Sequence, residues 1–280
     1  MRRSLILLLV LVLLTPALDQ AAEVDTVAIP SPTMSTSYKA VIALPDSYSH
    51  THLQYPVVYV LHGWSGSYAD WAKHTDVGPF ADEYQTILVF PDGGYAGWYL
   101  DSPKVDSSQY ETYIAKEVPA WIDTHYRTIR RTEGRAITGL SMGGHGAIAL
   151  LSKYPDTFIA GGSMSGVMDL RVSSQRYGIA ELIGKYEENP QRWKRQSSIG
   201  LIDSLQGLQR GIIIDCGVDD FLIDVNRNMH RHLLDLEIPH DYYERPGQHS
   251  WDFWTRVLPY HLLYFSEWIA EPELSGEHAQ

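Results

Sequence analysis

The chain has 280 residues, 44% of them hydrophobic and 20% charged, a composition typical of globular rather than disordered proteins. Its net charge of −12 argues against non-specific nucleic-acid binding, which depends on Lys and Arg, and against attraction to anionic lipid. The single cysteine, Cys216, excludes an internal disulfide framework and any cysteine-rich zinc or iron–sulfur site.

The N-terminus has the pattern of a secretory signal peptide. Arg2 and Arg3 precede an apolar run, Leu5–Leu14, and small residues continue to Ala22. A membrane span needs about 20 apolar residues, so a permanent anchor is the weaker interpretation. We therefore expect residues 1–22 to be cleaved and the mature protein, without a membrane span, to be secreted or periplasmic.

Short strand-like runs alternate with longer helical patterns along the rest of the chain. The expected strands are Tyr38–Leu44, Val57–Leu61, Ile87–Phe90, Arg135–Thr138, Ile159–Gly162, Ile212–Asp215 and His240–Glu244. The expected helices are 110–122, Gly143–Tyr154, Asp224–Leu236 and Trp254–Trp268, with Pro259 starting or kinking the last one. This alternation predicts an α/β fold, with a mostly parallel sheet covered on both faces and antiparallel strands at its N-terminal side. Arg171–Gln209 fits no such unit, and we expect it to be an insertion over one edge of the sheet.

A G-x-S-x-G pattern places Ser141 between an expected strand and an expected helix, in Gly139-Leu140-Ser141-Met142-Gly143. In a strand–turn–helix setting the serine occupies a sharp, strained bend and can act as a nucleophile. The alternative is a glycine-rich turn with an incidental serine.

A serine nucleophile needs a histidine base that is oriented by a carboxylate, and in this arrangement the chain order is Ser, Asp or Glu, His. His249 follows the strand expected at His240–Glu244 and is the candidate base. Asp220 follows the strand at Ile212–Asp215 and is the candidate acid, with its neighbour Asp219 as the alternative.

The negative charge of an acyl-transfer transition state must be met by backbone N–H groups. One donor is expected from Met142, the residue after the nucleophile. The other is expected from Trp64, in the turn Leu61-His62-Gly63-Trp64-Ser65-Gly66 that follows an earlier strand. That turn could equally be a plain strand–helix connection.

Together these motifs resemble the esterase D branch of the α/β-hydrolases, which includes S-formylglutathione hydrolases, feruloyl, acetylxylan and tributyrin esterases, and mycolyltransferases. The resemblance extends from about Tyr38 to Trp268, and its other carriers are 91–94, 216–221 and 247–251. It implies an α/β-hydrolase fold with one catalytic domain, 23–280, and a cap-like insertion at 171–209. It also implies Ser141 as nucleophile, Asp220 as acid, His249 as base, and Met142 and Trp64 as oxyanion donors. The family usually has a smaller residue where Trp64 stands.

Aromatic residues in the loops expected around the site suggest the kind of substrate. Trp98, Tyr99 and Trp251 are the predicted substrate-binding residues, because aromatic side chains stack on sugars or phenolic acyl groups. Core and rim packing is the alternative role for them. Neither a metal-binding pattern nor a P-loop or dinucleotide fingerprint is present in the sequence, so we expect no cofactor.

The sequence thus favours a secreted serine carboxylesterase that hydrolyses a small-molecule or polysaccharide ester, with acetyl or feruloyl sugar esters as candidates. An acyltransferase of the mycolyltransferase type uses the same acyl-enzyme and is the main alternative. A non-catalytic carbohydrate-binding protein and a peptidase are weaker alternatives. Nothing in the sequence indicates the oligomeric state.

Overall fold

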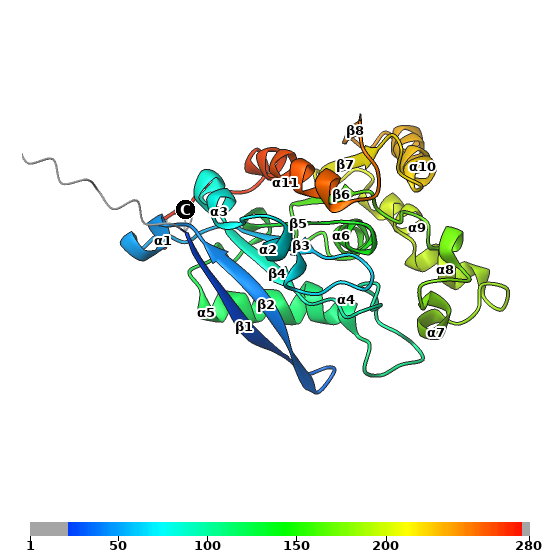
Figure 1. The fold of residues 1–280 in the computed structure, drawn as a ribbon, viewed down its shortest axis with the longest axis horizontal. Helices are drawn as coiled ribbons and strands as arrows, with labels where there is room; N and C mark the ends of the chain where they lie inside the picture. Colours follow the sequence, from blue (N-terminus) through cyan, green and yellow to red (C-terminus); the bar gives the residue numbers. More distant parts are fainter. Residues whose placement is uncertain (1–21, 276–280) are drawn as a thin grey trace, which may run out of the picture.

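A computed structural model describes residues 22–275 of the chain. The predicted signal peptide, except its last residue, and residues 276–280 lie outside the described residues. Within this part of the chain one sheet has the strand order β1-β2-β4-β3-β5-β6-β7-β8 (Figure 1). The strands are β1 Glu23–Ser31, β2 Thr36–Leu44, β3 Val57–Leu61, β4 Ile87–Pro91, β5 Arg135–Gly139, β6 Ala160–Met164, β7 Gly211–Gly217 and β8 Asp241–Arg245.

The predicted sheet is confirmed. β3 to β8 pair in parallel, whereas β2 is antiparallel to both β1 and β4. Every residue of β3 to β7 is buried, as expected of strands with helices on both faces. β1 was not among the strands expected from the sequence. It is mostly exposed and pairs only with β2, so it lacks a continuous apolar pattern.

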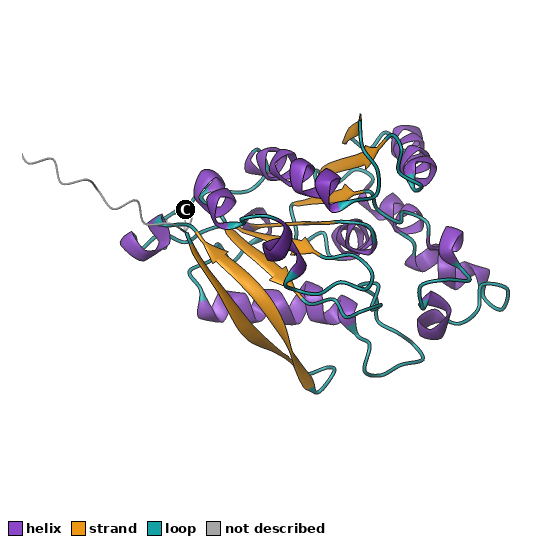
Figure 2. Cartoon of the chain, in the orientation of Figure 1, coloured by secondary structure: helices purple, strands orange, loops and turns teal. Residues whose placement is uncertain are grey.

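Helices lie on both sides of the sheet (Figure 2). They are α1 Ser47–His50, α2 Asp70–His74, α3 Gly78–Tyr84, α4 Tyr110–Thr112, α5 Val118–His125, α6 Met142–Lys153, α7 Ile179–Ile183, α8 Pro190–Gln196, α9 Ser198–Leu201, α10 Ile223–Asp235 and α11 Trp251–Ser266. A π-helical turn, η1 Tyr113–Glu117, joins α4 to α5, and 3-10 turns occupy Thr132–Gly134, Leu170–Ser173 and Ile202–Leu205.

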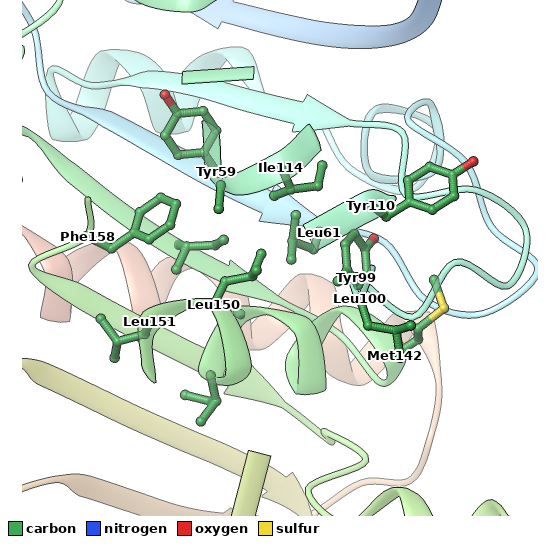
Figure 3. Close-up of a cluster of buried hydrophobic side chains, with 14 of the residues drawn as sticks. Tyr59, Leu61, Tyr99, Leu100, Tyr110, Ile114, Met142, Leu150, Leu151 and Phe158 are labelled. Carbon is green, nitrogen blue, oxygen red and sulfur yellow. The ribbon is translucent and has the colours of Figure 1, made fainter. Parts of the chain in front are cut away.

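Two apolar clusters join these helices to the sheet. Side chains of α5, α6 and α10 pack on one face, in the cluster that contains Leu61, Ile114 and Leu150 (Figure 3). Side chains of α2, α3 and α11 pack on the opposite face, around Trp71 and Phe253. Burying apolar surface on both faces of the sheet holds the layers together, at roughly 25 cal/mol per Å².

Two expectations about the last third of the chain are wrong in detail. α11 begins at Trp251, three residues before the predicted start, and Pro259 lies inside it. The segment 171–209 does not lie over an edge of the sheet. Its helix α9 packs against α6, which covers the central strands β3, β5 and β6. The polar composition that suggested an edge insertion reflects the solvent-facing side of this additional layer.

Candidate active site

Ser141 lies on a sharp turn between β5 and α6. Its backbone angles, φ 53° and ψ −112°, fall outside the regions that residues other than glycine adopt easily. This conformation costs about 1–3 kcal/mol in backbone strain. The flanking glycines make the bend possible. A Cβ atom on Gly139 would lie 2.6 Å from backbone atoms of Gly143, and one on Gly143 would lie 2.6 Å from the carbonyl oxygen of His62. Larger residues at these two positions would therefore force the turn open.

His249 lies within hydrogen-bond distance of Ser141. It is in the turn that follows β8, where the sequence placed it, and its Nε2 is 3.0 Å from the Ser141 Oγ. The imidazole lies between two aromatic rings, with centroids 4.5 Å from Phe221 and 4.9 Å from Trp254. These rings restrict the orientation of the imidazole beside the serine.

Asp220 is the aspartate that contacts the imidazole. Its carboxylate oxygens lie 2.9 and 3.1 Å from the His249 Nδ1, and the Leu222 N–H donates to it at 2.8 Å. Burial raises the pKa of Asp220, but its hydrogen bonds and the charge of His249 outweigh burial, so this pKa lies below its ordinary value. The alternative residue, Asp219, is exposed to solvent.

The turn after β3 lies directly against the Ser141 bend. A Cβ atom on Gly63 would lie 2.6 Å from the Leu140 side chain and 3.6 Å from the Ser141 Cβ. Among the described residues, neither the Trp64 N–H nor the Met142 N–H has a hydrogen-bond acceptor. Both predicted oxyanion donors are thus available to a ligand beside Ser141.

The buried His62 holds this turn in place through two hydrogen bonds. The Gly93 N–H donates to the His62 Nε2 at 2.8 Å, so the proton is on Nδ1, which donates to the Gly63 carbonyl at 2.8 Å. Burial lowers the pKa of His62 and favours this neutral form. Its role is to fix the backbone that precedes Trp64.

A cavity of about 590 Å³ opens beside Ser141 and His249. Of the predicted substrate-binding residues, Trp98 and Trp251 line it. Trp64, predicted as an oxyanion donor, also lines it, and the sequence did not identify five further lining residues: Val167, Ser173, Tyr177, Phe221 and Trp254. Val167, Ser173 and Tyr177 come from the β6–β7 connection, whose sequence carries no motif that could have identified them.

The prediction that Tyr99 contacts substrate is wrong. Tyr99 belongs to the buried cluster of Figure 3 and does not line the cavity. Its hydroxyl donates to the His62 carbonyl at 2.9 Å, and its ring fills the space beside Gly93 and Gly146. Tyr99 therefore stabilises, from the core side, the turn that contains Trp64.

The described residues also bear on cofactors and membranes. Between residues 22 and 275, no group of three His, Cys, Asp or Glu side chains is placed to hold a metal ion. In the same part of the chain, no helix combines the length and apolarity that a membrane crossing requires. Cys216 is buried, and burial raises the pKa of its thiol.

Comparisons with known proteins agree with this architecture. The model of the family described as "Putative esterase" matches residues 31–265. An esterase of Mycobacterium tuberculosis is 37% identical over 134 residues, which cover 46% of this chain but only 29% of that protein. An acetyl esterase of Caldicellulosiruptor saccharolyticus is 26% identical over 219 residues, covering 72% of this chain and 79% of that one. The solved structure of a ferulic acid esterase has a TM-score of 0.75 and 25% identity, and the match covers 89% of this chain and 99% of that one.

Proposed function

The chain belongs to the putative esterase family, and on that premise we propose that it is a secreted serine carboxylesterase with Ser141, His249 and Asp220 as its catalytic triad. The observation that carries the proposal is the continuous contact from the Ser141 hydroxyl through the His249 imidazole to the Asp220 carboxylate. Ser141 and His249 line the cavity, so a substrate there can reach them. Transfer of the Ser141 proton to His249 makes the hydroxyl nucleophilic, and the Asp220 carboxylate orients the imidazole and stabilises its protonated form.

The geometry supports a two-step mechanism. The Ser141 Oγ attacks the ester carbonyl as His249 Nε2 accepts its proton, and the N–H groups of Met142 and Trp64 stabilise the resulting oxyanion. His249 then gives the proton to the leaving alcohol, and the acyl group remains bound to Ser141. A water molecule, deprotonated by His249, releases the acid and restores the serine.

The shape of the cavity supports an acyl or sugar group of moderate size. Its volume lies within the roughly 300–1,000 Å³ of ordinary small-molecule sites. The Trp64 ring lies edge-on between Tyr95 and Tyr177, with both centroids 5.1 Å away. We propose esters of carbohydrates with acetyl or feruloyl groups as substrates, in keeping with the acetyl and ferulic acid esterases that this chain resembles.

Two broader features belong to the same proposal. Residues 23–280 would act as one catalytic domain, with 171–209 closing one side of the cavity. Residues 1–22 would direct export and be removed, which fits a polysaccharide substrate outside the cell.

Replacement of the proposed nucleophile tests the function. Ser141→Ala is expected to lower the hydrolysis of p-nitrophenyl acetate and butyrate by about 10⁴-fold or more, and to abolish labelling by a fluorophosphonate. Ser152→Ala, in the helix α6 that follows Ser141, removes a hydroxyl that donates to the Ile148 carbonyl, and is the matched control.

The outcomes of this test separate the alternatives. Labelling of the wild type excludes a non-catalytic carbohydrate-binding protein, and its absence would contradict the proposal. Feruloyl and acetyl sugar esters, each with and without an added sugar acceptor, then define the reaction. Faster formation of acylated sugar than of free acid would show an acyltransferase instead.

A further inference from the structure

Strand β8 forms one edge of the sheet. It pairs with β7 alone among the described strands, and Figure 1 shows it at the end of the sheet, beyond β7. Its sequence, Asp-Tyr-Tyr-Glu-Arg, contains no proline, and its pairing with β7 runs without a bulge, so two devices that keep an edge strand from pairing with another chain are absent. Three of its five residues are charged, with both signs present, so another strand can pair with it only in a register that sets opposite charges against each other.

The hydrogen bonds of β8 show which of its backbone groups are free. The Val218 N–H donates to the Arg245 carbonyl, so the backbone groups of Arg245 face β7. Because successive residues of a strand face opposite sides, Asp241 and Tyr243 also face β7. The N–H and C=O groups of Tyr242 and Glu244 therefore point outward, away from the sheet.

This edge is complementary to itself. If two copies meet antiparallel about a two-fold axis at Tyr243, the outward groups of Tyr242 face those of Glu244 in the second copy. Each Tyr242–Glu244 pair exchanges two backbone hydrogen bonds, and symmetry doubles them. The same register sets the acidic Asp241 opposite the basic Arg245 of the second copy. A shift by one residue would bring inward-facing groups to the edge and lose these bonds.

The Arg245 guanidinium has N–H donors that are available for that contact. Its Nε donates to the buried Asp215, while its two terminal nitrogens have no acceptor among residues 22–275. The rings of Tyr243 and Tyr260 hold the guanidinium between them, with centroids 4.6 and 4.2 Å away. A cation that is held in place and only partly hydrogen-bonded is preorganised for a carboxylate from outside.

Apolar side chains beside the edge are also left uncovered. Tyr243 is 40% exposed, Tyr260 47% and Leu263 54%, and all three line one shallow depression with Arg245. Tyrosine and arginine are enriched in protein interfaces.

We infer that β8 is a homodimer interface, through which two copies join their sheets by antiparallel β8–β8 pairing centred on Tyr243. The partner is a second copy of this chain because, in the antiparallel register centred on Tyr243, the outward backbone groups pair with each other and Asp241 faces the opposite charge of Arg245. The inference does not depend on the catalytic proposal.

Sedimentation velocity across a range of concentrations tests the interface. The wild type is expected to reach twice the mass of one mature chain. Glu244→Pro removes one outward N–H without removing a bond to β7, and should leave a monomer. Glu244→Ala keeps that N–H but loses the same contacts with Arg227 and Tyr242, so it should still dimerise. Circular dichroism would show that both variants fold.

Cross-linking tests the register. Tyr243 would face itself in a non-hydrogen-bonded pair, with Cα atoms about 4.5 Å apart, a distance that a disulfide spans. Tyr243→Cys should therefore oxidise to a covalent dimer, whereas Leu208→Cys, at a residue with a similar exposure of 41%, should not. A wild type that stays monomeric, or a dimer that survives Glu244→Pro and gives no cross-link at 243, would overturn the inference. Either result would assign the edge to another partner or to none.

Discussion

Two regions of this molecule each place a hydroxyl, an imidazole and a carboxylate in contact: an outer row at the cavity and an inner row within the sheet. At the cavity, Ser141, His249 and Asp220 place a hydroxyl 3.0 Å and a carboxylate 2.9 Å from one imidazole. Deeper in the sheet, the hydroxyl of Thr138 lies 2.8 Å from the His261 Nδ1, and the carboxylate of Asp215 lies 3.5 Å from the His261 Nε2. Both rows draw their hydroxyl from β5 or its end, and their carboxylate from β7 or the loop after it.

The inner row is closed to reaction by its surroundings. Thr138, His261 and Asp215 are fully buried, and none of them lines the cavity. Asp215 is paired with Arg245 rather than left to orient an imidazole. Thr138 lies within a regular strand, whereas Ser141 lies on a strained bend, and the N–H groups proposed as oxyanion donors have no acceptor among residues 22–275. The comparison indicates that access and backbone bend distinguish the proposed site from a set of buried polar contacts.

Replacing Asp220 and Asp215, one carboxylate from each row, is expected to give the largest effects, on catalysis and on stability respectively. Asp220→Asn should lower kcat by about 10⁴-fold, because the amide favours the wrong imidazole tautomer, with little loss of stability. Asp215→Asn should lower the free energy of unfolding by about 3 kcal/mol, because it leaves Arg245 without its buried counter-charge. Kinetics and urea unfolding of both variants check this. If Asp215→Asn lowers kcat of the folded enzyme as much as Asp220→Asn, the proposed division between the rows is wrong.

The oxyanion donors give the next largest effect. Trp64→Pro removes both the indole ring and the proposed donor N–H, and should lower kcat by about 10²–10³-fold more than loss of the ring alone. Trp64→Ala keeps that N–H and removes the ring, so it should change KM more than kcat. Steady-state kinetics on p-nitrophenyl acetate distinguish the two variants. Equal losses of kcat would mean that the ring, and not the N–H, supports the reaction.

The sequence predicted this fold and the contacts of the outer row more closely than it predicted the walls of the cavity. The buried strands stand out because their apolar runs are continuous. Ser141 stands out because its G-x-S-x-G pattern follows such a run, and His249 because it follows the strand expected at His240–Glu244. Asp220 could not be separated from Asp219, since the choice depends on how the loop after β7 turns. Tyr99 was misassigned because a loop position does not reveal whether a ring points to the cavity or to the core. Tyr177 carried no signal, because it reaches the cavity through the packing of the β6–β7 connection against α6.

His145 offers a smaller effect, from an imidazole in the first turn of α6, which Ser141 precedes, and it belongs to neither row. Its Nδ1 lies 2.7 Å from the Ser198 Oγ, and it is buried. Burial, aided by the charge of Lys153, lowers the pKa of His145 from 6.5 to about 3. Below pH 6.5 the unfolded chain therefore takes up a proton at this residue that the folded protein does not. The stability that the neutral imidazole contributes is complete above pH 6.5 and is lost as pH falls from 6.5 toward 3.

Between pH 7.5 and pH 5 this residue should cost the wild type about 2 kcal/mol of unfolding free energy. His145→Gln keeps a polar group near Ser198 but does not titrate, so its stability should fall by that much less over the same interval. Urea unfolding at the two pH values measures both losses. The buried His62 contributes equally in the two proteins, and the pKa of Asp220 lies below this interval, so neither affects the difference. Equal losses would show that His145 is protonated in the folded protein, and that its burial beside the nucleophile does not keep it neutral.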